Sequence, residues 1–236
     1  KERYPNIFFS QFTGAELVAD KWNLSREDLD QFALESHQKA AEASESKYFD
    51  REILPVEGKN AEGINDLVMT DEGIRFDASL DKLAGLNPVT EGGKITAGNA
   101  SQITDGAAAV LICNDAGLKK IKSNPRAEIV SISVVGDDPV FMLTGPIPAS
   151  HKALDIAKLS IDDIDIYEVN EAFAPVPLAW AEELKADRSK LNVNGGAMAL
   201  GHPLGATGAK LMTTMLHELE RRDGNYALQA LSLIHI

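Results

Sequence analysis

Residues 192–209 read Asn-Val-Asn-Gly-Gly-Ala-Met-Ala-Leu-Gly-His-Pro-Leu-Gly-Ala-Thr-Gly-Ala. Glycines surround a single histidine, His202, in this stretch. Because glycine loses the most backbone freedom on folding, such a cluster indicates positive φ angles or a close approach to another group. Pro203 fixes the backbone directly after the histidine, and a helical pattern follows over residues 206–222. The stretch therefore predicts that His202 lies on a rigid loop before a helix N-terminus, where the macrodipole favours negative charge.

The same stretch has simpler interpretations. A glycine-rich connection between a strand and a helix can be only a tight turn, in which His202 is a polar residue with satisfied hydrogen bonds. Two phosphate-binding interpretations fail. Gly205-Ala-Thr-Gly208 lacks the first glycine of G-x-G-x-x-G, and Lys210 does not occupy the lysine position of a P-loop. Base chemistry at His202 therefore requires a second polar group close by.

Asn170 is the candidate for that second group. Residues 164–169 alternate apolar with polar side chains and are predicted to form a strand that ends at Asn170. Ligands of α/β sheets bind at the carboxyl ends of strands. Histidine titrates near neutral pH and suits general base work, and the Asn170 amide can orient a water or donate to a developing oxyanion. The alternative is that Asn170 is a helix N-cap, with Glu171 in the first helical turn.

The remaining pattern predicts an α/β chain. Ser25 is a predicted N-cap, since Glu27 and Asp28 follow it. Residues 53–93 are weakly patterned, which is typical of a long loop that binds a ligand. The small residues at 96–101 allow either the close approach of another backbone or a narrow ligand, or a tightly packed turn. Alternating strands and helices after residue 114 predict buried strands. We expect helices at 15–22, 29–41, 80–83, 150–157 with Ser150 as its cap, 173–185 and 206–222, and strands at 53–56, 107–112, 128–135, 164–169, 191–194 and 226–233.

The composition limits the possible partners. The chain has 236 residues, a net charge of −13 and a pI near 4.8. Without a basic field, nucleic acid and anionic membrane surfaces are not expected partners, although a small anionic ligand needs only a local pocket. No apolar segment approaches the length of a membrane span. With Cys113 as the single cysteine, an intrachain disulfide is impossible and a cytoplasmic location is expected; Cys113 itself follows an apolar run and is expected in the core.

Several of these motifs together resemble the thiolases, which comprise acetyl-CoA acetyltransferases and 3-ketoacyl-CoA thiolases. The resemblance rests on Asn-Glu-Ala-Phe-Ala at 170–174 and on the long motif that contains Gly-His-Pro-x-Gly-x-x-Gly, and the spacing of the two also matches. Residues 96–106, Thr-Ala-Gly-Asn-Ala-Ser followed by Asp-Gly, are similar to the family's pantetheine-contacting segment. Residues 145–150, Gly-Pro-Ile-Pro-Ala-Ser, resemble a further family segment. The resemblance extends from about Thr13 to Leu231.

The resemblance implies a layered α/β fold of the αβαβα type, here the loop domain and most of the C-terminal half, in a homodimer or homotetramer. It implies an acyl-CoA acyltransferase that catalyses reversible Claisen condensation and thiolysis, with acetyl-CoA and acyl-CoA as substrates and with no cofactor or metal. By position, His202 would activate a cysteine nucleophile and Asn170 would hold an oxyanion-hole water. The remaining expected contacts are Ser101 and Ala97 in the pantetheine tunnel, Arg75 near the adenine nucleotide, and Met142 and Phe173 at the acyl pocket.

Two cysteines of the family pattern do not occur in this chain. The nucleophile belongs to the upstream half, and residues 232–236 read Ser-Leu-Ile-His-Ile where the family continues Cys-x-Gly-x-Gly. We therefore expect a fragment that is inactive alone, with exposed apolar surface and poor solubility. Its expected parts are a coenzyme-A-binding loop region with the end of the N-terminal half in residues 1–113, and a truncated C-terminal thiolase domain in residues 114–236.

Two other protein classes stay open beside the thiolase hypothesis. A non-catalytic thiolase-like protein would bind acyl-CoA or lipid and would have no nucleophile even in a complete gene. The intact pair of His202 and Asn170 argues against it. A ketoacyl synthase relative would share the duplicated α/β architecture. The Gly-His-Pro-x-Gly and Asn-Glu-Ala-Phe motifs favour the thiolases over that class.

Overall fold

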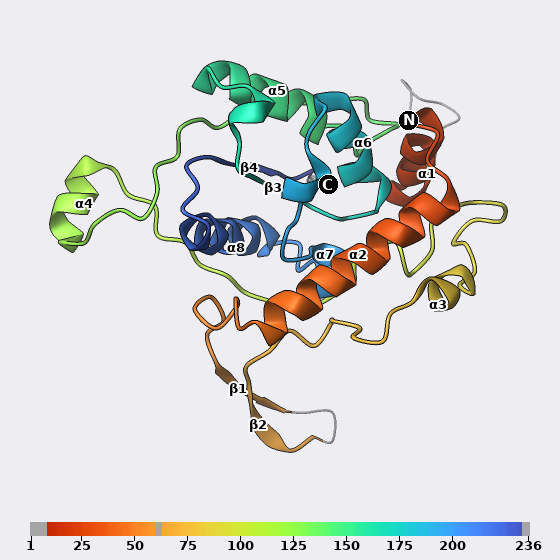
Figure 1. The fold of residues 1–236 in the computed structure, drawn as a ribbon, viewed down its shortest axis with the longest axis horizontal. Coiled ribbons are helices and arrows are strands. Elements are labelled where there is room, and N and C mark those ends of the chain that lie inside the picture. Colours follow the sequence, from red (N-terminus) through yellow and green to blue (C-terminus); the bar gives the residue numbers. More distant parts are fainter. Residues whose placement is uncertain (1–8, 60–62, 233–236) are drawn as a thin grey trace.

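A computed structural model describes residues 9–59 and 63–232 of the chain (Figure 1). The helices are α1 (Gln11–Lys21), α2 (Arg26–Glu45), α3 (Leu80–Ala84), α4 (Asp115–Ile121), α5 (Pro146–Ala157), α6 (Pro175–Leu184), α7 (Ala197–Leu200) and α8 (Thr207–Arg221), with short 3-10 turns at η1 (Ile161–Asp163) and η2 (Arg188–Lys190). The strands are β1 (Val56–Lys59), β2 (Asn65–Val68), β3 (Ile166–Val169) and β4 (Ala227–Ala230).

The centre of the fold is the parallel pair of strands β3 and β4. Ile166 lies opposite Ala227, and Val169 lies opposite Ala230. All four residues of β3 are buried, as is usual for a parallel strand covered on both faces. Helix α5 packs on β4 and α8 packs on both strands, and Figure 1 shows these helices on opposite sides of the pair. The result is a helix–strand–helix arrangement in which both strands end at the same edge.

Helices from the first part of the chain complete the core. A reciprocal capping box starts α2: the Asp28 backbone N–H donates to Ser25 Oγ at 3.1 Å, and the Ser25 backbone N–H donates to the Asp28 carboxylate at 2.8 Å. This geometry confirms the predicted N-cap. Helix α2 packs on α7 and α3, and α1 packs on α6, whose Trp180 is fully buried. Within the described residues, no helix has both the length and the apolar character needed to cross a bilayer.

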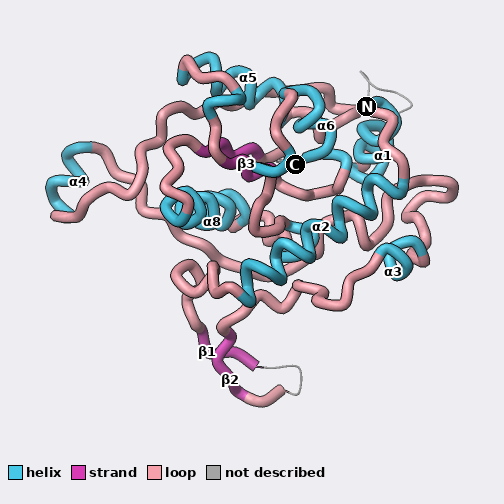
Figure 2. The backbone as a smooth tube through the Cα atoms, in the orientation of Figure 1, coloured by secondary structure: helices cyan, strands magenta, loops and turns pink. Residues whose placement is uncertain are grey.

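Two predicted strands do not form. Residues 107–112 and 128–135 have no regular secondary structure. Figure 2 draws the chain on both sides of α4 as loop. Leu111 is 76% exposed and Val134 is 82% exposed. Cys113 is also exposed, so its expected place in the core is wrong. The physical reason is that β-branched composition only suits a sheet, whereas a strand also needs a hydrogen-bonded neighbour, and no strand pairs with either segment in the described part of the chain.

Other predicted elements form with shifted boundaries. Instead of the strand expected at 53–56, β1 pairs with β2 in an antiparallel hairpin that projects from the body (Figure 1). Helix α5 begins at Pro146, so Ser150 is not its cap. The Ser150 hydroxyl accepts a hydrogen bond from Trp180 Nε1 at 2.8 Å. Proline at the first helical position is favourable because its missing N–H has no intrahelical partner there.

The strands expected near the end of the chain form only in part. The segment 191–194 contributes a single parallel bridge between Leu191 and Tyr167. The strand expected at 226–233 forms as β4, and its last predicted residue, Leu233, lies outside the described residues. The predicted helices 173–185 and 206–222 form as α6 and α8. The strand before Asn170 and the helix after His202 were therefore predicted correctly in type, whereas α7, which directly precedes the His202 loop, was not predicted.

Candidate active site

His202 and Asn170 meet at the carboxyl edge of β3. Asn170 directly follows this strand, and its backbone N–H donates to the Ala230 carbonyl of β4 at 3.0 Å. His202 follows α7, and its backbone N–H donates to the Gln102 carbonyl at 3.0 Å. Asn170 Nδ2 lies 3.3 Å from His202 Nε2. The two side chains that the sequence singled out as a base and its polar partner are thus in contact.

The surroundings of His202 favour the neutral imidazole. Its Nδ1 lies 2.6 Å from Thr207 Oγ1, in the first turn of α8. Burial lowers the pKa of His202, and the positive charge of Lys210 lowers it further. The Lys210 ammonium donates to the Leu200 carbonyl at 2.5 Å. His202 is therefore neutral at neutral pH, which is the protonation state that a general base requires.

Asn170 is not a helix cap. Helix α6 begins at Pro175 and its N-cap residue is Ala174, so the alternative interpretation of Asn170 is wrong. Asn170 is only 3% exposed, and its Oδ1 has no hydrogen-bond partner among the described residues. Buried amide oxygens are nearly always bonded to protein or to water. Asn170 therefore presents a free acceptor for a water or a ligand beside the imidazole.

Glu171 fixes the glycine-rich loop to helix α2. Its buried carboxylate accepts hydrogen bonds from Ser36 Oγ at 2.7 Å, Asn192 Nδ2 at 2.8 Å and the Met198 backbone N–H at 3.1 Å. Burial raises the pKa of Glu171, and these hydrogen bonds oppose the rise. The carboxylate lies so close to Gly196 that a β-carbon there would overlap it. Glu171 was expected in the first turn of a helix, and it instead joins two segments that are remote in sequence.

Gly195 is required by its conformation and by the space around it. Its φ is +78°, and a β-carbon would lie 2.5 Å from the Ser36 carbonyl oxygen and 2.7 Å from Ala40 Cβ. We expect Gly195→Ala to lower the free energy of unfolding by about 3 kcal/mol, because backbone strain adds to the overlap with α2. Gly92→Ala is the matched control, since Gly92 has φ +72° and no atom within 4 Å.

In the control variant Gly92→Ala, the free energy of unfolding is expected to fall by only about 1 kcal/mol, because backbone strain is the sole cost. Denaturant unfolding of both variants measures the difference. Equal losses for Gly195→Ala and Gly92→Ala would contradict the close approach of the glycine-rich loop to α2.

Two of the residues expected to contact the substrate lie beside the turn after Asn170. The Ser101 backbone N–H donates to the Ala172 carbonyl at 2.9 Å. Phe173 is buried and meets Phe12 of α1 edge-on, with ring centroids 5.3 Å apart. The small-residue segment at 96–101 therefore runs next to the Asn-Glu-Ala-Phe turn, as a pocket built from both would require.

Two further residues expected to contact the substrate, Met142 and Ala97, lie away from this turn in sequence and differ in their exposure. The Met142 carbonyl accepts a hydrogen bond from Ser232 Oγ at 3.3 Å, which places Met142 beside the end of β4. Met142 also has a positive φ of +59°, and it packs against the apolar cluster that contains Phe173. Ala97 is exposed on a turn in which the Thr96 backbone N–H donates to the Asn99 amide oxygen at 2.9 Å. Ala97 is thus accessible from solvent.

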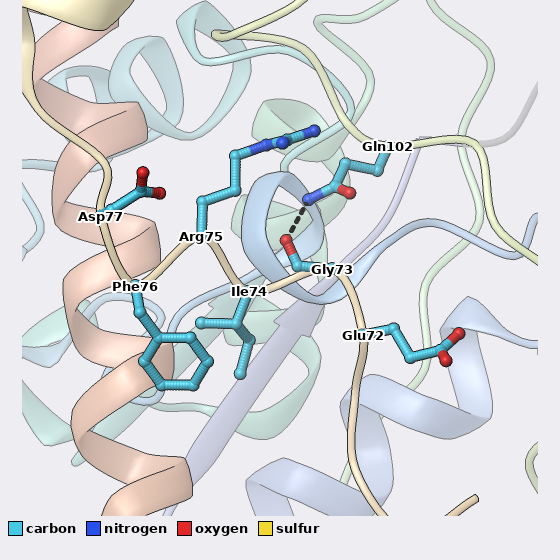
Figure 3. Close-up of a pocket in the computed structure, with 7 residues that line it drawn as sticks. All are labelled: Glu72, Gly73, Ile74, Arg75, Phe76, Asp77 and Gln102. Carbon is cyan, nitrogen blue, oxygen red and sulfur yellow. Dashed lines mark hydrogen bonds between the residues drawn. The ribbon is translucent and has the colours of Figure 1, made fainter. Parts of the chain in front are cut away.

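Arg75 lines a cavity of ≈ 360 Å³ together with its neighbours in the chain and Gln102 (Figure 3). Figure 3 shows the Arg75 and Gln102 side chains extending toward one another, while Phe76 points away. The Arg75 backbone N–H donates to His37 Nδ1 at 3.1 Å. Burial, followed by the charge of Arg75, lowers the pKa of His37 to about 4, so this acceptor is neutral at neutral pH. The buried imidazole therefore holds the Arg75 backbone in place.

Gln102 connects this cavity to the loop that carries His202. Its side-chain Nε2 donates to the Gly73 carbonyl at 2.8 Å and to the Met198 carbonyl at 2.7 Å, and its backbone carbonyl accepts the His202 backbone N–H. Sequence reasoning missed Gln102 because these partners are 29 and 96 residues away. The one available signal was its position directly after the run of small residues at 96–101.

Comparison with known proteins identifies relatives along almost the whole chain. The model of the thiolase N-terminal domain matches residues 7–116, and that of the thiolase C-terminal domain matches residues 123–233. Steroid 3-ketoacyl-CoA thiolase FadA6 of Mycobacterium tuberculosis is 55% identical, over 97% of this chain and 55% of that protein. Rat mitochondrial 3-ketoacyl-CoA thiolase is 46% identical, over 91% of this chain and 54% of its own length.

Cupriavidus necator acetyl-CoA acetyltransferase is 43% identical, over 93% of this chain and 56% of its own length. The chain thus spans about half the length of the curated relatives it matches. Human mitochondrial 3-ketoacyl-CoA thiolase superposes with a TM-score of 0.88 at 44% identity, over 93% of this chain and 56% of that one. Bacillus anthracis acetyl-CoA acetyltransferase superposes with a TM-score of 0.90 at 39% identity, over 97% of this chain and 58% of that one. These matches confirm the predicted α/β thiolase-like fold, and the chain belongs to the thiolase family.

Proposed function

We propose that this chain is part of an acyl-CoA acyltransferase that condenses acyl-CoA units into 3-ketoacyl-CoA and cleaves 3-ketoacyl-CoA by thiolysis. The observation that carries the proposal is the contact between His202 Nε2 and Asn170 Nδ2 at 3.3 Å, with the imidazole neutral. The relatives support it, because they are named as 3-ketoacyl-CoA thiolases and an acetyl-CoA acetyltransferase. Since the chain spans about half of those relatives, we propose that the cysteine nucleophile lies outside its 236 residues.

His202 is the proposed base of the acylation step. Nε2 takes the proton of the cysteine thiol, and the thiolate attacks the thioester carbonyl. The carbon–sulfur bond to coenzyme A then breaks, and the departing thiolate takes the proton back from the imidazolium. The Asn170 amide holds a water that donates to the oxyanion as charge develops. In condensation, a second base, the family's late cysteine whose position Ser232 occupies here, takes a proton from the α-carbon of a second acyl-CoA. This carbon attacks the acyl-cysteine, and the cysteine sulfur leaves as the thiolate. Thiolysis is the same sequence in reverse.

The coenzyme A substrate is proposed to run from the Arg75 cavity to the imidazole. Arg75 lies beside the adenine nucleotide, Ala97 and Ser101 line the pantetheine arm, and Met142 and Phe173 border the acyl group. The position of Ser101 beside the Asn-Glu-Ala-Phe turn supports this path, as does the cavity at Arg75. Human mitochondrial 3-ketoacyl-CoA thiolase, a structural relative, has been solved in complex with CoA.

The organisation of the protein follows the same proposal. Residues 1–113 form the coenzyme-A-binding loop region with the end of the N-terminal half, and residues 114–236 belong to the C-terminal thiolase domain. The apolar side chains exposed on 107–112 and 128–135 support burial of these two segments in the complete protein, which we propose is a homodimer or homotetramer. A cytoplasmic location is proposed because the chain has one cysteine and no disulfide.

A chimaera with a relative tests the function. Residues 9–231 of this chain replace the aligned part of FadA6, which supplies the remaining sequence at both ends. We expect thiolysis of acetoacetyl-CoA or of a longer 3-ketoacyl-CoA with a kcat of about 1–10³ s⁻¹, the usual range of enzymes. The 236-residue chain alone is expected to show no turnover, because it lacks the upstream nucleophile. Enzyme-like turnover by the chain alone would contradict the proposal.

The chimaera also separates this function from its alternative. A folded chimaera that binds CoA but turns over no substrate would favour a non-catalytic protein that binds acyl-CoA or lipid. Ser232 is the residue that keeps this alternative open, since a serine hydroxyl cannot exchange protons near neutral pH as a thiol does. A second chimaera that keeps Ser232 is therefore expected to be much slower than the first, and circular dichroism shows whether both are folded.

A further inference from the structure

Thr207 lies between His202 and the backbone of the loop that carries it. Thr207 Oγ1 is 2.6 Å from His202 Nδ1 and 2.9 Å from the Pro203 carbonyl oxygen. Thr207 is only 1% exposed, so water cannot replace either partner easily. On the opposite side of the ring, Nε2 faces the amide nitrogen of Asn170. Both ring nitrogens therefore have a defined protein partner.

The chemistry of these partners decides where the single proton of the neutral ring resides. A carbonyl oxygen only accepts, so the one hydroxyl hydrogen of Thr207 is donated to Pro203. Thr207 Oγ1 then offers a lone pair to His202, and Nδ1 must carry the hydrogen to complete the short contact. An amide NH₂ only donates, so Nε2 opposite Asn170 must present its lone pair. The two sides of the ring agree on one tautomer.

We propose that Thr207 is a positioning residue that holds neutral His202 in the Nδ1–H tautomer, so that Nε2 keeps its lone pair at the edge of the site. Its importance for catalysis rests on the proposed function, because Nε2 is the atom that takes the thiol proton. The tautomer itself does not depend on turnover. Thr207 also fixes the rotation of the ring, since the two hydrogen bonds of its hydroxyl join the imidazole to the backbone one turn earlier.

Loss of the threonine hydroxyl has a defined consequence. In Thr207→Val, Nδ1–H would face a methyl group and would be buried without a partner, which is unfavourable. The ring can then move its proton to Nε2 if the Asn170 amide turns over, because Asn170 Oδ1 is buried and has no partner among the described residues. We expect the ratio of the two tautomers to shift toward Nε2–H by roughly two- to ten-fold, the equivalent of one hydrogen bond.

Two other histidines provide reference signals within the same molecule. His217 Nδ1 lies 2.9 Å from the Thr213 carbonyl oxygen, so its Nδ1 carries hydrogen. His37 Nδ1 accepts the Arg75 backbone N–H, so in the neutral ring its proton is on Nε2. One spectrum therefore contains both patterns, against which His202 can be compared.

The test is nitrogen-15 NMR of the histidine rings in the full 236-residue chain, recorded by magic-angle spinning on sedimented protein so that self-association does not interfere. The spectrum is taken at about pH 8, above the reference pKa of a histidine side chain. His202→Gln identifies the His202 signals. We expect His202 to show the His217 pattern, Thr207→Ser to keep it, and Thr207→Val to lose it in part.

Thr213→Val is the matched control, because Thr213 Oγ1 makes the same type of bond to the Ala209 carbonyl in the same helix at 2.9 Å, without contacting His202. It should leave the His202 signals unchanged. A wild-type His202 with the Nε2–H pattern of His37 would overturn the proposal, even if Thr207→Val does not fold. A folded Thr207→Val, with His37 and His217 signals unchanged, that keeps the Nδ1–H pattern in full would also overturn it. An inactive chimaera would instead refute the proposed function and leave the tautomer result standing.

Discussion

We expect His202→Ala to lower kcat/KM for thiolysis by about 10²- to 10⁴-fold in the FadA6 chimaera, the usual contribution of a positioned general base. The reason is that Nε2, which faces Asn170 at 3.3 Å at the carboxyl edge of β3, is the atom proposed to take the thiol proton. Without it, the nucleophile would stay a thiol at neutral pH, and the thiol is the poor nucleophile.

His217→Gln is the matched control for this substitution. His217 lies on α8 like Thr207, but its ring bonds to the Thr213 carbonyl and not to Asn170. The control should keep the chimaera's kcat/KM within about threefold, which is the change expected of a small structural perturbation. A His202→Ala chimaera that keeps its fold and loses no more activity than His217→Gln would show that His202 is not the base.

We expect Asn170→Ala to lower kcat by about 10²- to 10³-fold in the same chimaera, with KM changed little, as for the loss of one oxyanion-hole donor. The buried Asn170 amide has no side-chain partner other than His202 among the described residues, so its loss removes a group that acts on developing charge and not on the fold.

Asn170→Asp provides a second variant of the same size. It would place a carboxylate beside Nε2, which raises the pKa of His202 and increases the protonated fraction of the ring at neutral pH. Its activity should therefore fall at neutral pH and recover in part as the pH rises. A rise in KM with an unchanged kcat, in either variant, would assign Asn170 to ground-state binding of the substrate and not to the oxyanion.

The sequence predicted the parts of the site that are encoded locally. The strand before Asn170, the helix after His202 and the glycine-rich loop between them each have a pattern within about twenty residues. The contacts that fix these parts are remote. Ser36 bonds to Glu171 across 135 residues, so no local pattern could assign Glu171 its role. Thr207 lies within the glycine-rich motif, yet its bond to His202 depends on how the loop folds.

The wrong predictions at 107–112, at 128–135 and at Cys113 share one physical origin. Residues 107–112 and 128–135 have the composition of buried strands, but they form no strand in the described chain, where no neighbouring strand pairs with them. The hydrogen bonds of a strand require a second segment, whereas those of a helix lie within the segment itself. Cys113 follows the first of these segments and is exposed with it. Ser25 shows the contrast, because the capping box it forms with Asp28 is local and was predicted correctly.

The most direct test of the central claim, that this chain supplies the base and the oxyanion partner to a nucleophile located elsewhere, is intact-mass spectrometry after mixing with acetyl-CoA. The chimaera should gain one acetyl group on a cysteine of the FadA6 segment, and the gain should be much slower in its His202→Ala variant. The 236-residue chain alone should gain none. Acetylation of the chain alone at Cys113 or Ser232, or a folded chimaera that gains no acetyl group, would contradict the claim.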